Sequence, residues 1–458
     1  ELSGRNKKCC QRFSSKIKMV KKSFRKNALK FFDYVICAVL INPFFFAAIV
    51  CSILFYSGAV KVKERKAFLS LIPSENISSL KGKIESNPVK TSSGNMYSAD
   101  FAVEEAISLR GEKSSSKGNV HLLIPDVLVE ACYPGKLYTS SKKYGDVSLF
   151  EQGSYFELNV VCLDSSKNLF KVTAGKEKKI ENPVLKNKIS RFRGICRLQF
   201  KRLMYGWGKA GGLLLALLSG SREYTEKSLS LAFTDAGLSH ILALSGMHLN
   251  LFGSLAFFFG NRFLKKSKAD FFQLIAIVFF VWFAGISPSL CRALISSMLI
   301  FFNSLLKIKT ADGLTVLSLT FLIQSIIFPE HIHSPAFILS YSALCGIILF
   351  GKMFRNLFSR RFFPNFASAL GDSAAAQLCT APVSLKFWGK FAPAGIISCV
   401  FVSPLVLFFL YVGAAGTVLC LFLPFLSGAF NVIMNVIYSL IFNTVIFFSR
   451  FPCVNIEN

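Results

Sequence analysis

Long apolar runs, separated by short polar breaks, fill the second half of the 458-residue chain. Runs of about 20 apolar residues are long enough to cross a bilayer as helices. Residues 413–424, broken by Gly and Pro, predict a connector or half-helix, and residues 209–219 predict a shallow apolar helix too short to cross. We expect eight spans, at residues 237–260, 270–286, 289–306, 313–328, 335–351, 367–385, 393–412 and 427–448.

Another apolar run lies near the N-terminus, from Tyr34 to Tyr56, and predicts a first span. Asn42-Pro43 in its middle should kink this helix or split it into a re-entrant pair. Together the runs predict a polytopic α-helical membrane protein with about nine transmembrane helices.

Residues 60–180 show a different pattern, in which apolar and polar residues alternate. Tyr97, Ala99, Phe101 and Val103 form one face at a period of two, which is typical of a strand. Gly-containing pairs such as Gly118-Asn119 predict turns between strands. We expect a small β domain, a five-stranded barrel of the OB type. Nearly balanced charge and few exposed aromatics favour a scaffold role over direct DNA contact.

Residues 186–204 carry seven Lys/Arg among apolar residues at helical spacing. Such a basic amphipathic helix is typical of a membrane interface, and a positive collar beside the path of a polyanion is the alternative. The predicted organisation is a basic leader (1–33), a first transmembrane helix (34–58), the β domain (59–182), the interfacial helix (183–208), a polytopic domain (209–452) and a tail (453–458).

Charge is distributed unevenly along the chain. Lys and Arg number 53 against 25 Asp and Glu, a net charge of +28, and residues 1–209 hold 37 of the basic residues. Only 17% of residues are charged, against about 25% in soluble proteins, so a purely soluble or disordered chain is excluded. Eleven Lys/Arg in the first 30 residues place the N-terminus in the cytoplasm, and the β domain therefore outside it.

Most of the 13 cysteines lie in or beside apolar runs, where Cys behaves as a small hydrophobe. Cys132 and Cys162 fall in the segment placed outside the cytoplasm. They could therefore pair as a disulfide.

Polar residues inside predicted spans are the candidates for function, because they are expensive in a bilayer. HILALSGMHLNLF (240–252) contains His240, Ser245, His248 and Asn250 within one span. A Ser–His pair can act as nucleophile and base, but no acid partner or G-x-S-x-G elbow accompanies this one. We therefore favour polar lining of a cavity, or hydrogen bonding between helices.

The second candidate is Arg292 in GISPSLCRALISSM (285–298). An Arg at the centre of a bilayer costs roughly 2.5–3.5 kcal/mol, so it should face protein or water. Two roles remain open: an ion pair with an acid such as Asp235 or Asp372, or a contact to phosphate on a conduction path.

Motifs for nucleotide or metal chemistry are missing from the sequence. It contains no P-loop, no G-x-G-x-x-G and no H-x-H-x-D-H run, and His331-Ile-His333 lacks the further ligands of a zinc site. We predict no enzymatic activity, no cofactor and no metal.

Four motifs in order resemble the ComEC family of competence membrane proteins. HILALSGMHLNLF is similar to its H-L-L-A-x-S-G-L-H-V segment, and Arg292 with Ala293 and Met298 resembles its R-A-x-x-M pattern. SPAFILSYSALCGIILF (334–350) and AAAQLCTAPVSLKFWGKFAPAGIISCVFVSPL (374–405) resemble two later segments, with Ser398 or Cys399 where Asn is commoner. The resemblance spans residues 206–425, and residues 60–175 resemble the family's external domain more loosely.

The resemblance implies an inner-membrane channel that passes one strand of transforming DNA into the cytoplasm. It also implies pilus or receptor partners outside, a helicase or DNA-binding protein inside, and a homo-oligomer as one option. Arg292 would contact phosphate, and His240, Ser245, His248, Asn250 and Gln377 would line or gate the path. Many members carry a metallo-β-lactamase-like nuclease domain whose motif is missing here, so we expect another protein to degrade the second strand.

Two alternatives remain from other classes. One is a non-transporting membrane scaffold or relic of the family, and the other is a transporter of another anionic substrate.

Overall fold

The computed structural model describes residues 42–60, 68–91, 94–131, 149–177, 185–263, 266–306 and 312–455. The chain divides into two compact units, Glu1–Val62 with Met298–Trp388 and Lys63–Ser297 with Gly389–Asn458. The predicted leader and Cys132 lie outside the described residues.

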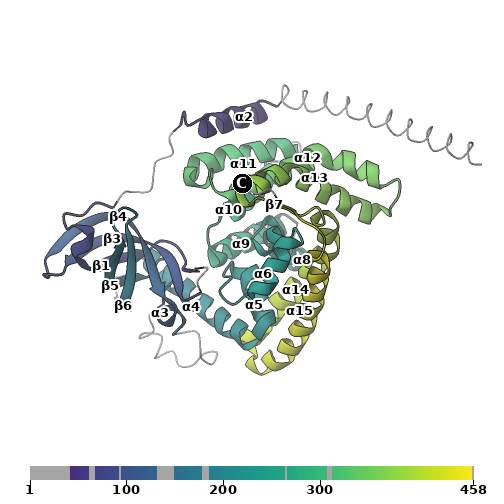
Figure 1. Ribbon diagram of the computed structural model, residues 1–458. Coiled ribbons are helices and arrows are strands. Elements are labelled where there is room, and N and C mark those ends of the chain that lie inside the picture. The colour runs from purple at the N-terminus through teal and green to yellow at the C-terminus, as the bar shows by residue number, and fades with distance from the viewer. Residues whose placement is uncertain are drawn as a thin grey trace, which may run out of the picture. The chain divides into compact units, whose positions relative to one another are not determined.

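A β-barrel forms the first part of the second unit (Figure 1). Its strands are β1 (Ile77–Ile84), β2 (Val89–Lys90), β3 (Met96–Ser108), β4 (Lys113–Pro125), β5 (Tyr155–Asp164) and β6 (Leu169–Glu177), with the short helix α3 (Asp126–Glu130) after β4. Five strands close in the order β1–β5–β6–β4–β3 and back to β1, and β2 pairs only with β3. The β4–β6 pairing is parallel and the others are antiparallel. This closed barrel agrees with the predicted OB type.

The alternation in the sequence sets the barrel core. Tyr97, Ala99, Phe101 and Val103 are all buried, as their period of two predicts. Leu80, Leu122, Phe156 and Phe170 from the other strands complete this core. The predicted turn at Gly118-Asn119 is wrong, because both residues lie within β4. Gly118 has φ +117° beside a register shift in the β3–β4 pairing, so the glycine marks a bulge in the strand.

Helices make up the rest of the second unit. They are α4 (Leu185–Gly206), α5 (Gly208–Ser219), α6 (Lys227–Asp235), α7 (Ser239–Leu242), α8 (Gly246–Phe263), α9 (Lys266–Ala284), α10 (Pro288–Leu305), α14 (Gly395–Phe422) and α15 (Ser427–Ser449). The boundary between the units falls within α10.

Helix α5 is apolar and too short to cross a membrane, as predicted, and it is buried among other helices. Every residue from Ala210 to Ser219 is buried, and its leucines join a core with α14 and α15. A helix that is apolar on all sides belongs in a core. Gly212 is needed there, because a Cβ at this position would lie 2.2 Å from the Tyr224 carbonyl oxygen.

Helices α14 and α15 form a hairpin, so the predicted connector at 413–424 is largely wrong. The helix α14 continues to Phe422, and Gly413 packs against Leu214 of α5 instead of ending the helix. After α15 the chain returns, and β8 (Val454–Asn455) pairs with β7 (Lys390–Phe391). The C-terminal segment and the start of α14 therefore lie at the same end of this hairpin.

The first unit contains α2 (Pro43–Tyr56), α11 (Gly313–Ile327), α12 (Pro335–Phe358) and α13 (Pro364–Trp388). The helix α2 begins at Pro43, and the Asn42 side chain caps it by accepting from the Phe45 N–H at 3.2 Å. Asn42 also donates to Thr315 of α11 at 2.8 Å. The Asn42-Pro43 pair thus starts a helix, while residues 34–41 lie outside the described part.

Each of the eight later predicted spans coincides with a helix or a helix pair. Among the described residues, four are long and apolar enough to cross a membrane: Pro288–Leu305, Pro335–Phe358, Gly395–Phe422 and Pro424–Ser449. The helices α2, α5 and α11 are apolar but shorter. The protein is therefore a helical membrane protein with a barrel, and nine crossings remain a prediction.

Candidate functional site

The polar motif at 240–252 breaks its helix, which differs from the single span expected at 237–260. The helix α7 ends at Leu242, Ala243 is extended with φ −81° and ψ 138°, and α8 begins at Gly246. A broken helix leaves backbone N–H groups at the start of its second half without helical partners. In membrane proteins such breaks occur where the backbone is buried in protein or lines a cavity.

Ser245 and His248 stabilise the start of α8. The Ser245 N–H donates to His248 Nδ1 at 3.1 Å, and Ser245 Oγ lies 3.2 Å from the same nitrogen. This contact is one half of a capping box, with His248 in the place usually taken by Glu or Gln, while the His248 backbone N–H donates to the Ser245 backbone carbonyl at 3.2 Å. The imidazole is completely buried. Because Nδ1 already accepts the backbone N–H, it is poorly placed to serve Ser245 as a catalytic base.

The first turn of α10 contacts this break. Ser289 Oγ donates to the Leu244 carbonyl at 2.5 Å. Arg292 reaches the beginning of α8, where its Nη2 lies 3.1 Å from the point that a Cβ on Gly246 would occupy. A guanidinium and a helix N-terminus both favour negative charge. Together they make the break a positively biased point within an apolar set of helices.

The other predicted residues of this span lie elsewhere. His240 is exposed, and its Nε2 lies 3.8 Å from Cys399 Sγ on α14. Asn250 is exposed on α8 and so is not grouped with the buried His248. Ser398, which stands where the resembled motif usually has Asn, donates to the Ala236 carbonyl at 2.8 Å and is fully buried.

Gln377 and Asp372 belong to the other compact unit, on α13. Asp372 pairs with Arg355 of α12 at 2.8 Å, so it already has a cation within its own unit. Gln377 is half-buried. Cys162 lies half-buried on β5, and its predicted pairing with Cys132 falls outside the described residues.

The two histidines of His331-Ile-His333 point to different partners. His331 stacks on Phe328 and contacts Gln324, and His333 meets the ring of Tyr56 edge-on. Within the described part of the chain, no three His, Cys, Asp or Glu residues gather as a metal site.

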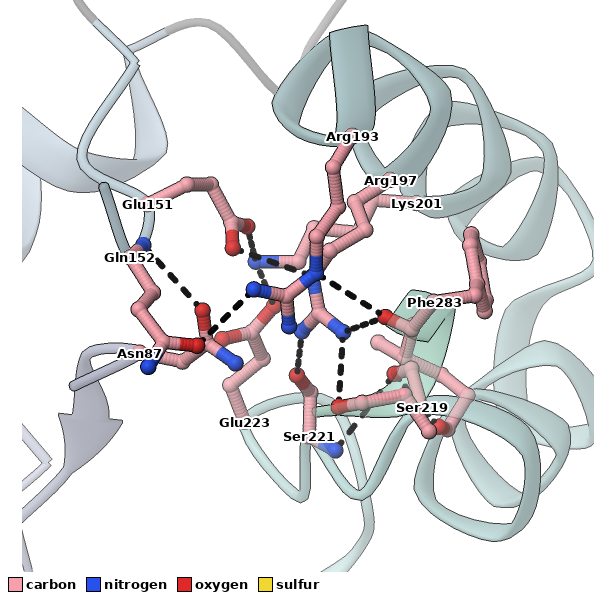
Figure 2. Close-up of polar contacts among 12 residues, drawn as sticks. Asn87, Glu151, Gln152, Arg193, Arg197, Lys201, Ser219, Ser221, Glu223 and Phe283 are labelled. Carbon is pink, nitrogen blue, oxygen red and sulfur yellow. Dashed lines mark hydrogen bonds and ion pairs between the residues drawn. The ribbon is translucent and has the colours of Figure 1, made fainter. Parts of the chain in front are cut away.

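A buried ionic network is the feature that the sequence did not reveal. Figure 2 shows Glu151, from the loop before β5, meeting the basic residues of α4. Arg197 Nε lies 3.0 Å from Glu151, and its Nη1 donates to the Phe283 carbonyl at 2.9 Å. Lys201 bridges Glu151 and Glu223, each at 3.2 Å. We call this set, together with Arg193, the junction network.

The electrostatics of the junction network follow from its burial. Burial raises the pKa of Glu151, but Arg197, Lys201 and Arg193 outweigh this effect and hold the pKa below the usual range. Burial alone would lower the pKa of Lys201, yet Glu151 and Glu223 leave it raised. The network therefore holds its charged form.

This network changes the interpretation of residues 186–204. They form a helix as predicted, but Arg193, Arg197 and Lys201 are buried instead of lying on a surface. Their spacing of four residues, which puts them on one helix face, was the available signal. The sequence could not indicate that two glutamates, 46 residues before Arg197 and 22 after Lys201, would meet that face.

Comparison with known proteins identifies one matching family model and two similar proteins. A family model described as "Competence protein" matches residues 217–458. The chain is 26% identical over 215 residues to ComE operon protein 3 of Bacillus subtilis (strain 168), covering 46% of this chain and 26% of that protein. It is 28% identical over 239 residues to an uncharacterized protein of Aquifex aeolicus (strain VF5), covering 52% of this chain and 54% of that one. The chain thus spans about a quarter and about half of these relatives. No solved structure matches it.

Proposed function

The chain belongs to the competence protein family, and we propose that it forms an inner-membrane channel through which single-stranded DNA enters the cytoplasm during natural competence. The family model covers the end of α5 and the helices from α6 onward, including α7, α8 and α10. The single observation that carries the proposal is the helix break at 243–245 with Arg292 against it.

A polyanion can cross hydrocarbon only along a hydrated, positively biased route. The break supplies the N-terminal dipole of α8, and Arg292 adds a full charge next to it. In this proposal Arg292 contacts backbone phosphates as they pass. These contacts do not depend on base identity, so transport would be independent of sequence.

The other path residues take different proposed roles. Ser245 and His248 hold the break open as its cap, which makes His248 a positioning residue. His240, Asn250 and Gln377 are proposed as polar lining further along the route. The N-terminus would lie in the cytoplasm and the barrel outside, where pilus or receptor components deliver DNA and a cytoplasmic helicase or DNA-binding protein withdraws it.

Replacement of Arg292 by Leu tests the proposal in a transformable strain that depends on this chain. We expect uptake of labelled DNA to fall roughly tenfold or more, the effect of losing one charge-assisted contact per passing phosphate. Arg292→Lys, which keeps the charge without the planar fork, should retain part of the uptake.

The matched control is Arg262→Leu, which removes one exposed positive charge from the end of α8. Membrane levels of all three variants are measured by immunoblot. Wild-type uptake in Arg292→Leu at normal protein level would exclude Arg292 from the path. Normal transformation after deletion of the gene would refute the uptake function altogether.

A further inference from the structure

Arg193 is the one member of the junction network whose guanidinium is incompletely satisfied. It is 7% exposed, and its Nη1 donates to Gln152 Oε1 at 2.8 Å. Its Nε reaches the Phe283 carbonyl only at 3.5 Å. Its Nη2 is buried and has no hydrogen-bond partner among the described residues. Leaving a buried charged donor unsatisfied is costly, so such an atom usually indicates a ligand or water.

The charges around Arg193 do not balance. Three cations are buried, and the two buried carboxylates, Glu151 and Glu223, already pair with Arg197 and Lys201. Among the described residues, the ion pairs of this network join Arg197 and Lys201 to the two carboxylates, and none includes Arg193. Burial and the neighbouring Arg197 lower the pKa of Arg193 to about 10, so it is still charged at neutral pH. The network thus carries one surplus positive charge.

A second donor faces the same point as Arg193 Nη2. Gly285, with φ +105°, has no Cβ, and a Cβ built there would lie 3.0 Å from Arg193 Nη2 and 3.1 Å from Asn87 Nδ2. The two nitrogens are therefore at most about 6 Å apart, a separation that the oxygens of one phosphate can bridge. The Asn87 amide is oriented by the Gln152 N–H, which donates to its Oδ1 at 3.2 Å. Its NH₂ group is thus directed toward Gly285.

The surroundings of this pair resemble a membrane–water interface. Phe192, beside Arg193 on α4, is 60% exposed and stacks on Trp282 at 6.1 Å between ring centroids. Phe279 is also exposed and lies 5.4 Å from Trp282. Exposed aromatic clusters at the end of an apolar helix are typical of the headgroup level.

We propose that Arg193 and Asn87, which meet beside the bare backbone of Gly285, bind the phosphate of an anionic phospholipid, whose acyl chains lie against Phe192, Trp282 and Phe279. The lipid supplies the negative charge that the junction network lacks. It also joins the barrel, through Asn87, to α4 and the end of α9. Lipid binding at this site does not depend on the proposed DNA path, since it requires no DNA strand to be present.

Native mass spectrometry of the full chain in detergent tests this assignment. Phosphatidylglycerol and phosphatidylcholine are added in parallel, and we expect preferential retention of phosphatidylglycerol. Arg193→Gln should reduce that retention about tenfold, since it removes the charged donor. Lys188→Gln is the matched control, because it removes an exposed charge from the same helix.

Asn87→Asp distinguishes a lipid site from a merely structural arginine. Asp keeps the acceptor for the Gln152 N–H but places a carboxylate oxygen within about 6 Å of Arg193 Nη2. The variant should lose phosphatidylglycerol retention and, without lipid, should melt at a higher temperature than the wild type. The proposal is overturned if both lipids bind equally, or if Arg193→Gln keeps the wild-type preference. It is also overturned if inorganic phosphate or a single-stranded oligonucleotide, but not phosphatidylglycerol, binds in an Arg193-dependent manner.

Discussion

Arg197 and Arg292 both have long basic side chains that contact other segments of the chain, but the environments of the two side chains differ. Arg197 is 1% exposed and is held by a carboxylate, two backbone carbonyls and a serine hydroxyl. Arg292 is half-buried and lies against the bare backbone at Gly246, where a helix begins. The first arrangement ties the barrel loop to the helices, and the second brings positive charge to a helix break.

The difference matters because breaking a buried ion pair and removing a half-buried cation at a helix break have different consequences. Loss of one partner in the junction network leaves an uncompensated buried charge, which destabilises the fold strongly. Loss of Arg292 removes a positive charge from the break between α7 and α8, where the backbone is already without regular helical hydrogen bonds. We therefore expect substitutions in the junction network to lower the stability of the fold. Substitutions at the break should instead lower DNA transport.

Arg197→Met should produce the largest loss of stability. It leaves Glu151 with Lys201 as its ion-pair partner and Arg193 further away, and it removes the donors to the Phe283 and Ala284 carbonyls. The expected destabilisation is about 3–5 kcal/mol, the range for breaking a buried pair. Denaturant unfolding of the full chain in detergent measures it. The same change at exposed Arg360 is the control, and equal stability of the two variants would contradict the role of the network.

Glu151→Gln should be less damaging and should remove a pH dependence. At neutral pH we expect a loss of about 2 kcal/mol, because Gln keeps one oxygen that can accept from Arg197 or Lys201 but loses the charge and the second acceptor. The folded-state pKa of Glu151 is lowered, so its stabilisation is fully present above the unfolded pKa of about 4.3 and declines as pH falls through the lower folded pKa. The gap between wild type and variant should therefore narrow below about pH 4.3. Unfolding measured at several pH values checks this, and a constant gap would argue against it.

Regular features of the molecule could be predicted from the sequence, because they follow from local periodicity. The buried face Tyr97–Val103 and the positions of the later helices came directly from it. The errors have a common cause in long-range packing. Gly413 and Gly118 suggested a break and a turn, yet the first lets α14 approach α5 and the second forms a bulge within β4.

The part of the candidate site that depends on local sequence could be predicted, and the part that depends on long-range packing could not. Polar residues in apolar runs identified Ser245, His248 and Arg292, and the structure brings these three to one helix break. It does not bring Asn250 to the buried side of α8. The junction network was missed because its carboxylates lie far from α4 in the sequence, and only the fold brings them together.

His248→Leu should have a moderate effect on the break. It removes the acceptor for the Ser245 N–H, and loss of a helix cap costs about 1 kcal/mol. His248→Gln should lose less, since Gln at this position can reach back to the same N–H. Hydrogen exchange of the Ser245 amide reports the cap directly. Equal protection in all three proteins would show that His248 does not hold the break.

Gly246→Ala should have the smallest effect on stability and still reduce uptake. The added Cβ would lie 3.1 Å from Arg292 Nη2, the far end of a flexible side chain, so the guanidinium can move aside. Alanine also favours the helix by up to about 1 kcal/mol, which offsets the tighter contact. Gly428→Ala is a matched control in the first turn of α15, where a Cβ meets nothing within 4 Å. If Arg292 contacts the strand at this break, Gly246→Ala should lower DNA uptake at near wild-type stability, while Gly428→Ala changes neither. Equal uptake in both variants would mean that the position of Arg292 beside α8 is unimportant for transport. The contact of Arg292 with the break would then be purely structural, like the contacts of the junction network.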